Sequence, residues 1–296
     1  MAKLKPDKIL APDLMEYLDS YSDFSFELAV LNMLRASGID CEHGGYYEDP
    51  VTKKSREFDI RAIKTIQQFR VRMALECKNI RDNFPILISC VPRHEQESYH
   101  QIAMVGTQKT DPYSIAGSLH QSRATTLSIT QQYSLYKNGE PVGKSTAQVG
   151  RALDSTISSN DAELYEKWGQ CLSSIGDLVS RAYWDGNDDD ERYYSAVFPF
   201  VVVPNERLWM VTYDKDGNRT SEPVQTNRCS CYIDKDYEMG MTTLGIRKWM
   251  YLSHMEIVTF DGLKAFVEKY LQSEEGMEYI FPKDGIFEAF KKHMKK

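Results

Sequence analysis

Two segments, REFDIRA at residues 56–62 and RVRMALECKN at residues 70–79, decide how this chain folds. In both segments apolar and polar side chains alternate, which is typical of β-strands with one buried face. The polar stretch KTIQQ at residues 64–68 allows the two strands to pair as an antiparallel hairpin. We therefore expect a sheet built around this hairpin.

The expected hairpin gathers charged side chains. Asp59 lies on its first strand, and Glu76 and Lys78 lie on its second. Residues two apart leave a strand on the same face, so Glu76 and Lys78 point to one side and Cys77 to the other. Two carboxylates and an ammonium on one face are costly unless something binds between them, and a divalent cation is the obvious candidate. The plainer alternative is an ordinary same-face ion pair worth ~0.2–1 kcal/mol.

An amphipathic helix is predicted before the hairpin, at residues 24–34. Its apolar side chains fall on one side at Phe26, Val30, Met33 and Leu34. Gly38 ends the helix, as glycine often does, and the helix carries Glu27. The segment DCEHGGYY at residues 40–47 is then expected to form the first strand.

Asp59 followed by the triplet Glu76-Cys77-Lys78, behind a helix that carries a glutamate, resembles the PD-(D/E)XK nuclease superfamily. The resemblance covers roughly residues 20 to 90, and it departs from the name motif at Phe58, where that motif has proline. It implies an α/β fold with a restriction-endonuclease-like core, a mixed central sheet flanked by helices. It also implies an insertion and C-terminal additions around that core.

The resemblance implies a role for each residue of the expected site. Asp59, Glu76 and the main-chain carbonyl of Cys77 would ligate Mg²⁺, for which Mn²⁺ could substitute. Lys78 would orient or deprotonate the attacking water, and Glu27 would reach the cluster directly or through a water. The implied activity is Mg²⁺-dependent hydrolysis of phosphodiester bonds, most of all in DNA, as in bacterial restriction and phage-defence nucleases.

Two other classes of function remain open. The chain could keep the nuclease fold only to bind nucleic acid or protein, or it could hydrolyse smaller phosphate esters. The net charge of −7 does not suit a protein that coats nucleic acid nonspecifically, and this favours the binding alternative modestly. The sequence leaves open DNA against RNA, endonuclease against exonuclease, and oligomeric state, although a homodimer is possible.

We expect one domain over residues 1–296. Its core would take in about residues 20–90 plus 145–213, with an insertion at 93–147 and a C-terminal extension at 214–296. The insertion is polar, rich in Gln, Ser, Thr and Tyr, and is predicted to be irregular.

Patterns outside the hairpin predict further elements. A helix is expected to begin at residues 145–153, where it would carry Gln148 and Arg151, and a second helix spans 161–183 with apolar residues at core spacing. Residues 195–203 are strongly strand-like, and we expect 207–213 to be the partner strand. Helices are expected again at 262–271 and 286–294.

The composition is that of an ordinary soluble globular protein, with 42% hydrophobic and 27% charged residues. No apolar run approaches the ~20 residues that cross a bilayer, and no secretory signal precedes the first helix. Six cysteines without a framework spacing indicate free thiols in a reducing compartment. We therefore expect a cytoplasmic protein with no membrane partner.

Overall fold

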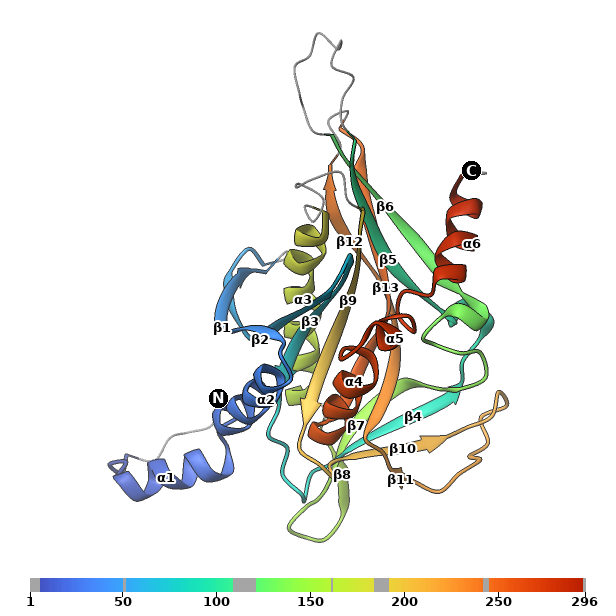
Figure 1. The fold of residues 1–296 in the computed structure, drawn as a ribbon. Helices are drawn as coiled ribbons and strands as arrows, with labels where there is room; N and C mark the ends of the chain where they lie inside the picture. The colour runs from blue at the N-terminus through green and yellow to red at the C-terminus, as the bar shows by residue number, and fades with distance from the viewer. Residues whose placement is uncertain are drawn as a thin grey trace.

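The computed structural model describes residues 6–49, 52–108, 121–160, 162–183, 192–241 and 245–294. Its helices are α1 (Ala11–Ser20), α2 (Phe24–Ala36), α3 (Ala162–Tyr183), α4 (Phe260–Tyr270), α5 (Glu274–Met277) and α6 (Lys283–Met294). Its strands are β1 (Asp40–Glu48), β2 (Ser55–Ile66), β3 (Phe69–Cys77), β4 (Ile86–Pro92), β5 (Tyr99–Gln108), β6 (Gln121–Thr130), β7 (Pro141–Arg151), β8 (Ile157–Ser159), β9 (Arg192–Val203), β10 (Leu208–Thr212), β11 (Val224–Gln225), β12 (Arg228–Met241) and β13 (Arg247–Thr259) (Figure 1). None of the helices in these ranges has the length and apolar character needed to cross a membrane.

The strands form one mixed sheet whose main path runs β1-β2-β3-β9-β13-β12-β7-β4-β10-β11. β1, β2 and β3 are an antiparallel meander. β9 then lies parallel to β3, from Phe69↔Tyr194 to Cys77↔Val202, and β13 lies parallel to β9. β5 pairs with the first part of β9 and carries β6 on its other edge, while β8 pairs with β7. The β3–β9 pair therefore joins the expected hairpin to the rest of the sheet.

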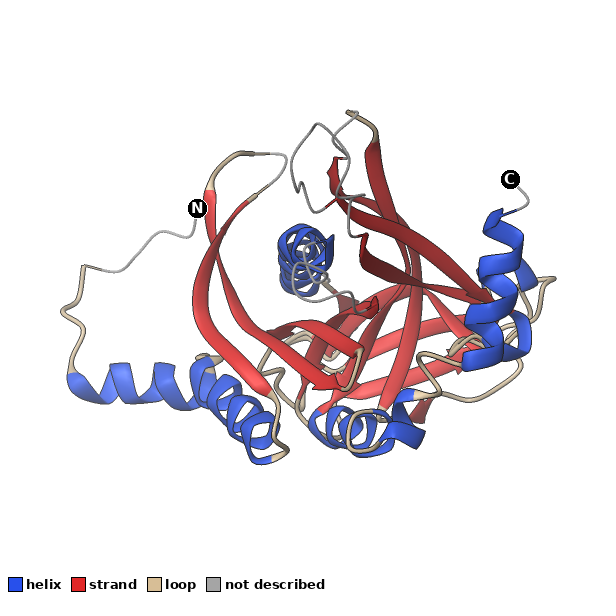
Figure 2. Cartoon of the chain, turned by 45° about the horizontal axis from the view of Figure 1, so that its top comes forward, coloured by secondary structure: helices blue, strands red, loops and turns tan. Residues whose placement is uncertain are grey.

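The sheet curves around α3, which lies on its concave face, and the remaining helices lie outside that curve (Figure 2). Alternate residues of β9 supply both layers, since Val201 packs in the α3 core and Phe200 packs in the core of α2 and α4. A strand buried on both faces has an almost continuous apolar sequence, as residues 195–203 do. This explains why that strand is conspicuous in the sequence.

Several sequence predictions are confirmed. The helix expected at 24–34 is α2, the strand at 40–47 is β1, and the hairpin is β2 and β3. Gln67 has a left-handed backbone, with φ of 52°, in the tight turn between those two strands. The helices expected at 161–183, 262–271 and 286–294 are α3, α4 and α6 with small shifts of their ends. Apolar residues recur with a strong period in these elements, and such a period can be recognised from the local sequence alone.

Three expectations were wrong. Residues 145–153 are mostly part of β7 and not a helix, because Gln148 and its neighbours pair with β4. The described part of the segment at 93–147 is not irregular: it contains β5, β6 and most of β7, and its Thr and Tyr residues suit half-exposed strands. Residues 109–120 lie outside the described part of the chain. Finally, β10 pairs with β4 and β11, and not with β9.

The expected core and the expected additions share one sheet. β5, from the segment predicted as an insertion, pairs antiparallel with β9. β13, from the segment predicted as a C-terminal extension, pairs in parallel with the later part of β9. β5 and β13 therefore follow one another along the same edge of β9. The site described below therefore lies on a sheet that is continuous with both segments.

A buried carboxylate joins β12, β13 and the loop before β7. Glu256 is fully buried and accepts hydrogen bonds from Arg228 Nε at 2.8 Å, Arg228 Nη2 at 3.0 Å and the Tyr136 hydroxyl at 2.8 Å. Burial by itself would raise the pKa of Glu256, but the charge and hydrogen bonds of Arg228 outweigh it and lower the pKa to about 2. The pair is therefore a satisfied structural ion pair.

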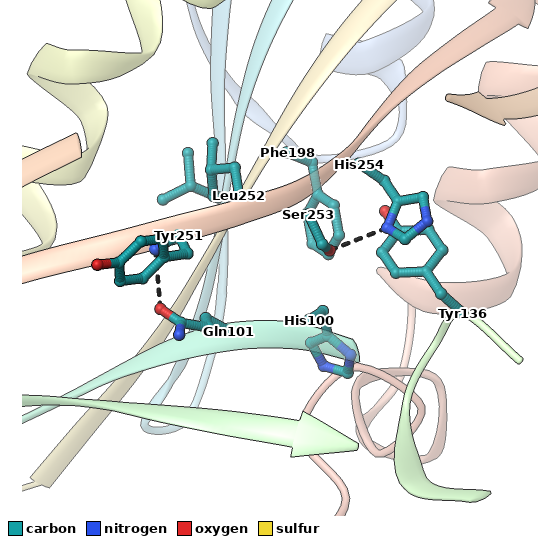
Figure 3. A pocket seen from close by; sticks show the side chains of 9 residues that line it. His100, Gln101, Tyr136, Phe198, Tyr251, Leu252, Ser253 and His254 are labelled. Atoms are coloured by element: carbon teal, nitrogen blue, oxygen red, sulfur yellow. Dashed lines mark hydrogen bonds between the residues drawn. The ribbon is translucent and has the colours of Figure 1, made fainter. Parts of the chain in front are cut away.

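Two buried histidines line a small pocket beside this ion pair (Figure 3). His254 Nε2 accepts the Arg93 Nε–H at 3.2 Å, which leaves its Nδ1–H to donate to Ser253 Oγ at 2.9 Å. His100 Nε2–H donates to the carbonyl of Ile280 at 2.8 Å, and its Nδ1 accepts a main-chain N–H. The free space between them is about 10 Å³, close to the minimum for one water, so this pocket serves packing and not ligand binding.

We expect these histidines to make the protein acid-sensitive. Burial lowers the pKa of His100 to about 4 and that of His254 to about 3, against an ordinary value of 6.5. Below pH 6.5 each histidine binds a proton in the unfolded chain but not in the folded chain. The free energy of unfolding therefore decreases as the pH is lowered, by at most about 1.4 kcal/mol per pH unit for each histidine. Urea unfolding at a series of pH values between about 7 and 5 measures this slope. His100→Gln should make the free energy of unfolding depend less steeply on pH. An unchanged slope would contradict the conclusion that His100 is buried in its neutral form.

A close approach at the start of α4 generates a second stability prediction. A Cβ on Gly262 would lie 1.8 Å from the carbonyl oxygen of Asn227, whereas a Cβ on the exposed Gly169 of α3 would meet nothing within 4 Å. Gly262→Ala should therefore lower the free energy of unfolding by at least ~2 kcal/mol. Gly169→Ala should raise it by about 0.5–1 kcal/mol, because alanine favours helix. Urea denaturation of both variants tests the contrast, and a stable Gly262→Ala protein would refute the packing.

Candidate functional site

Asp59 and Glu76 meet where the ladder between β2 and β3 ends. The last paired residues are Ile60 and Leu75, and beyond them Asp59 Oδ2 accepts the main-chain N–H of Cys77 at 2.7 Å. Ile60 and Leu75 pack in the layer away from α3, so their neighbours Asp59 and Glu76 face α3. The expected convergence of these two carboxylates on one face of the sheet is confirmed.

The cation between these carboxylates is Lys167 of α3. Its Nζ lies 2.8 Å from Asp59 Oδ2 and 3.6 Å from Glu76 Oε2, and its side chain is 15% exposed. Burial by itself would lower the pKa of Lys167, but the charges of Asp59 and Glu76 outweigh burial and raise it. Lys167 is therefore held as an ammonium between the two acids.

Glu76 is the buried floor of the site. Its side chain is 1% exposed, and its Oε2 has no hydrogen-bond partner among the described residues. Burial raises the pKa of Glu76 well above its ordinary range, and the charge of Asp59 raises it further, against the opposing effect of Lys167. Burial and Asp59 therefore favour the protonated form of Glu76, and added positive charge beside it would favour the ionised form.

Lys78 lies at the rim and reaches toward the start of α2. Its Nζ is 3.3 Å from Asp23 Oδ2, while Asp23 Oδ1 accepts the main-chain N–H of Asn79 at 2.7 Å. Asp23 is the N-cap residue of α2, yet its side chain does not cap that helix. Instead, Asp23 ties the end of β3 to α2 and directs Lys78 to the edge of the site.

Glu27 approaches the site from the first turn of α2. Its Oε2 lies 3.5 Å from Nε2 of His43, which comes from β1. Burial raises the pKa of Glu27, and the negative charge of Asp59 raises it further. The contact of the Glu27 side chain is with His43, and the charge of Asp59 acts on it only electrostatically.

The main chain of Cys77 adds an oxygen on the same side as Asp59. The N–H of Lys78 points toward β9 and donates to the carbonyl of Val202 at 2.9 Å. Because the backbone groups of successive residues in a strand point to opposite edges, the N–H and C=O of Cys77 point toward β2. The thiol of Cys77 is fully buried on the opposite face, and burial raises its pKa well above its ordinary range. It is therefore the carbonyl, and not the thiol, that is placed to serve as a ligand.

Carboxyl groups outnumber ammonium groups in this site. Among the side chains that the structure describes there, the carboxylates are those of Asp23, Glu27, Asp59 and Glu76, and the ammonium groups are those of Lys78 and Lys167. No group of three or more His, Cys, Asp or Glu side chains placed to hold a metal is found in the described ranges. The oxygens of Asp59, Glu76 and Cys77 nevertheless form the hard donor set that Mg²⁺ binds, since Mg²⁺ usually keeps several waters and takes only one or two carboxylates.

Sequence reasoning missed two residues of this site. Lys167 could have been found, because it falls three residues after Leu164 and four before Cys171, both of which are buried. A lysine at core spacing on an amphipathic helix needs a buried partner. Asp23 gave no such signal, because an aspartate just before a helix is ordinarily read as a cap.

No family model, no curated protein and no solved structure matches this chain. The functional interpretation therefore depends on the arrangement of Asp59, Glu76, Lys167 and the residues around them. Each of these positions is defined by contacts between elements that are far apart in the sequence.

Proposed function

We propose that this chain is a Mg²⁺-dependent nuclease that hydrolyses phosphodiester bonds, in DNA before other substrates. One observation carries the proposal: Asp59 and Glu76 converge at the end of the β2–β3 ladder, where the Glu76 side chain is 1% exposed and its Oε2 has no hydrogen-bond partner among the described residues. A hard divalent cation is a ligand that would stabilise both groups as carboxylates. Mn²⁺ is expected to replace Mg²⁺.

The arrangement of the surrounding elements supports the same proposal. α2, the meander β1–β2–β3, then α3, and β9 parallel to β3 form a compact unit within residues 20–90 and 145–213. This is a mixed sheet flanked by helices, as proposed for a restriction-endonuclease-like core. The acidic pair lies on the face of this unit that α3 covers.

The roles of the residues follow from their positions. Asp59, Glu76 and the Cys77 carbonyl would hold the metal ion, which supplies charge neutralisation and an activated water when it is bound. Lys78, 18% exposed at the rim, is placed to offer its ammonium to an entering phosphate and to orient the attacking water. Glu27 is placed to accept a hydrogen bond from a water at the edge of the cluster.

The second candidate is a module that binds nucleic acid or protein without cleaving it. The observation that favours it is Lys167, which already neutralises part of the charge of Asp59 and Glu76. The net charge of −7 points the same way. Such a module would need no divalent ion, and the two candidates therefore differ in a measurable property.

Cleavage assays with linear, circular and single-stranded DNA and with RNA, in Mg²⁺ or Mn²⁺, test the proposal. We expect Glu76→Gln to lower the cleavage rate by roughly two orders of magnitude or more, because it removes a metal carboxylate. The melting temperature should stay the same or rise, since a neutral amide of the same shape replaces a costly buried carboxylate. Glu57→Gln, two residues from Asp59 on the same strand, is the matched control and should retain activity.

The result that would contradict the proposal is specific. A native protein that cleaves none of these substrates would support the non-catalytic candidate. Cleavage that survives in Glu76→Gln would show that any nuclease activity lies elsewhere or comes from a contaminant.

A further inference from the structure

The ammonium of Lys167 lies where the proposed metal ion would need to be. Its Nζ is 2.8 Å from Asp59 Oδ2 and bridges toward Glu76 Oε2 at 3.6 Å. Asp59 Oδ2 also accepts the N–H of Cys77, so this oxygen is oriented by the backbone and does not need Lys167 to hold it in place. The orientation of the Asp59 carboxylate is therefore set by the backbone as well as by Lys167.

Lys167 extends a flexible side chain from a part of α3 that is held by buried neighbours. Leu164 and Cys171, one turn to either side on α3, are fully buried, which fixes the part of the helix that carries Lys167. A lysine side chain has a flexible four-carbon stem, so its ammonium can change position without movement of the helix backbone. The Lys167 side chain is 15% exposed and is therefore not sealed inside the protein.

The carboxylate pair remains short of positive charge with Lys167 in place. Glu76 is 1% exposed, and its Oε2 has no hydrogen-bond partner among the described residues, although Lys167 lies 3.6 Å away. A divalent ion carries twice the charge of an ammonium and can approach both carboxylates at ligand distance. Exchange of the ammonium for such an ion is therefore favoured by the charge of the site.

We propose that Lys167 is an internal cation that neutralises the Asp59–Glu76 pair in the metal-free protein and gives the pair up when a divalent ion binds. Metal and ammonium then compete for the same oxygens, and the metal affinity of the native protein is lower than the carboxylates alone would provide. The displaced ammonium stays at the mouth of the site, where it adds positive charge beside the ion. This inference rests on the metal site of the proposed function but not on cleavage.

Calorimetric titration of the full chain with Mn²⁺ tests the competition. Lys167→Met keeps the length and apolar stem of the side chain but removes the competing charge. We expect it to bind Mn²⁺ at least tenfold more tightly than the native protein, which requires a gain of only about 1.4 kcal/mol. Lys64→Met is the matched control, because Lys64 lies on β2 but contacts the main-chain carbonyl of Gly38, and its affinity should equal that of the native protein.

The dependence of the melting temperature on Mn²⁺ gives a second readout. Without metal, Lys167→Met should melt below the native protein, since two carboxylates lose their counter-ion. Saturating Mn²⁺ should raise its melting temperature by more than it raises that of the native protein. If the variant is unfolded without metal, refolding by Mn²⁺ supports the proposal, and failure to fold at saturating Mn²⁺ contradicts it.

The outcomes separate this inference from the proposed function. Equal or weaker Mn²⁺ binding by Lys167→Met overturns the competition and leaves the metal site standing. Absence of Mn²⁺ binding by the native protein and by Lys167→Met overturns the metal site, and with it both proposals.

Discussion

The structure depends on one electrostatic constraint, which is that two carboxylates share a small volume at the end of a strand ladder. Asp59 is fixed there by the amide of Cys77, and Glu76 is fixed by the burial of β3 between β2 and β9. Burial and the charge of Asp59 both disfavour the ionised form of Glu76, so a cation between the two groups stabilises their ionised state. The structure supplies Lys167 for this purpose, from a helix 108 residues along the chain from Asp59.

The fold serves this constraint by placing a long helix against a curved sheet. α3 lies along the concave face and is held there by an apolar stripe that includes Leu164, Cys171 and Ile175. The charged side chains Lys167 and Asp177 on the same helix meet Asp59 and Arg61 on β2, one ion pair inside the site and one outside it. The position of α3 is therefore determined by packing along its length and by charge at two points.

Local sequence predicted the half of the site that lies on adjacent strands. Asp59 and Glu76 could be placed on one face because strand alternation and a short turn are local rules, and α2 with Glu27 followed from helical periodicity. Lys167 and Asp23 depend on tertiary packing that no local rule contains. The same limit explains the errors in the fold: β7 is a strand because it pairs with β4, and β10 pairs with β4 and β11 because of tertiary packing that the sequence near it does not show.

Crystals soaked in Mn²⁺ test most directly whether Asp59 and Glu76 share a divalent ion, as we propose. We expect an anomalous peak within about 2–2.5 Å of one oxygen each from Asp59, Glu76 and the carbonyl of Cys77. We also expect Nζ of Lys167 to have left the position between the two carboxylates. A peak elsewhere, or no peak at saturating Mn²⁺ with Lys167 still bridging the pair, would contradict the proposed metal site.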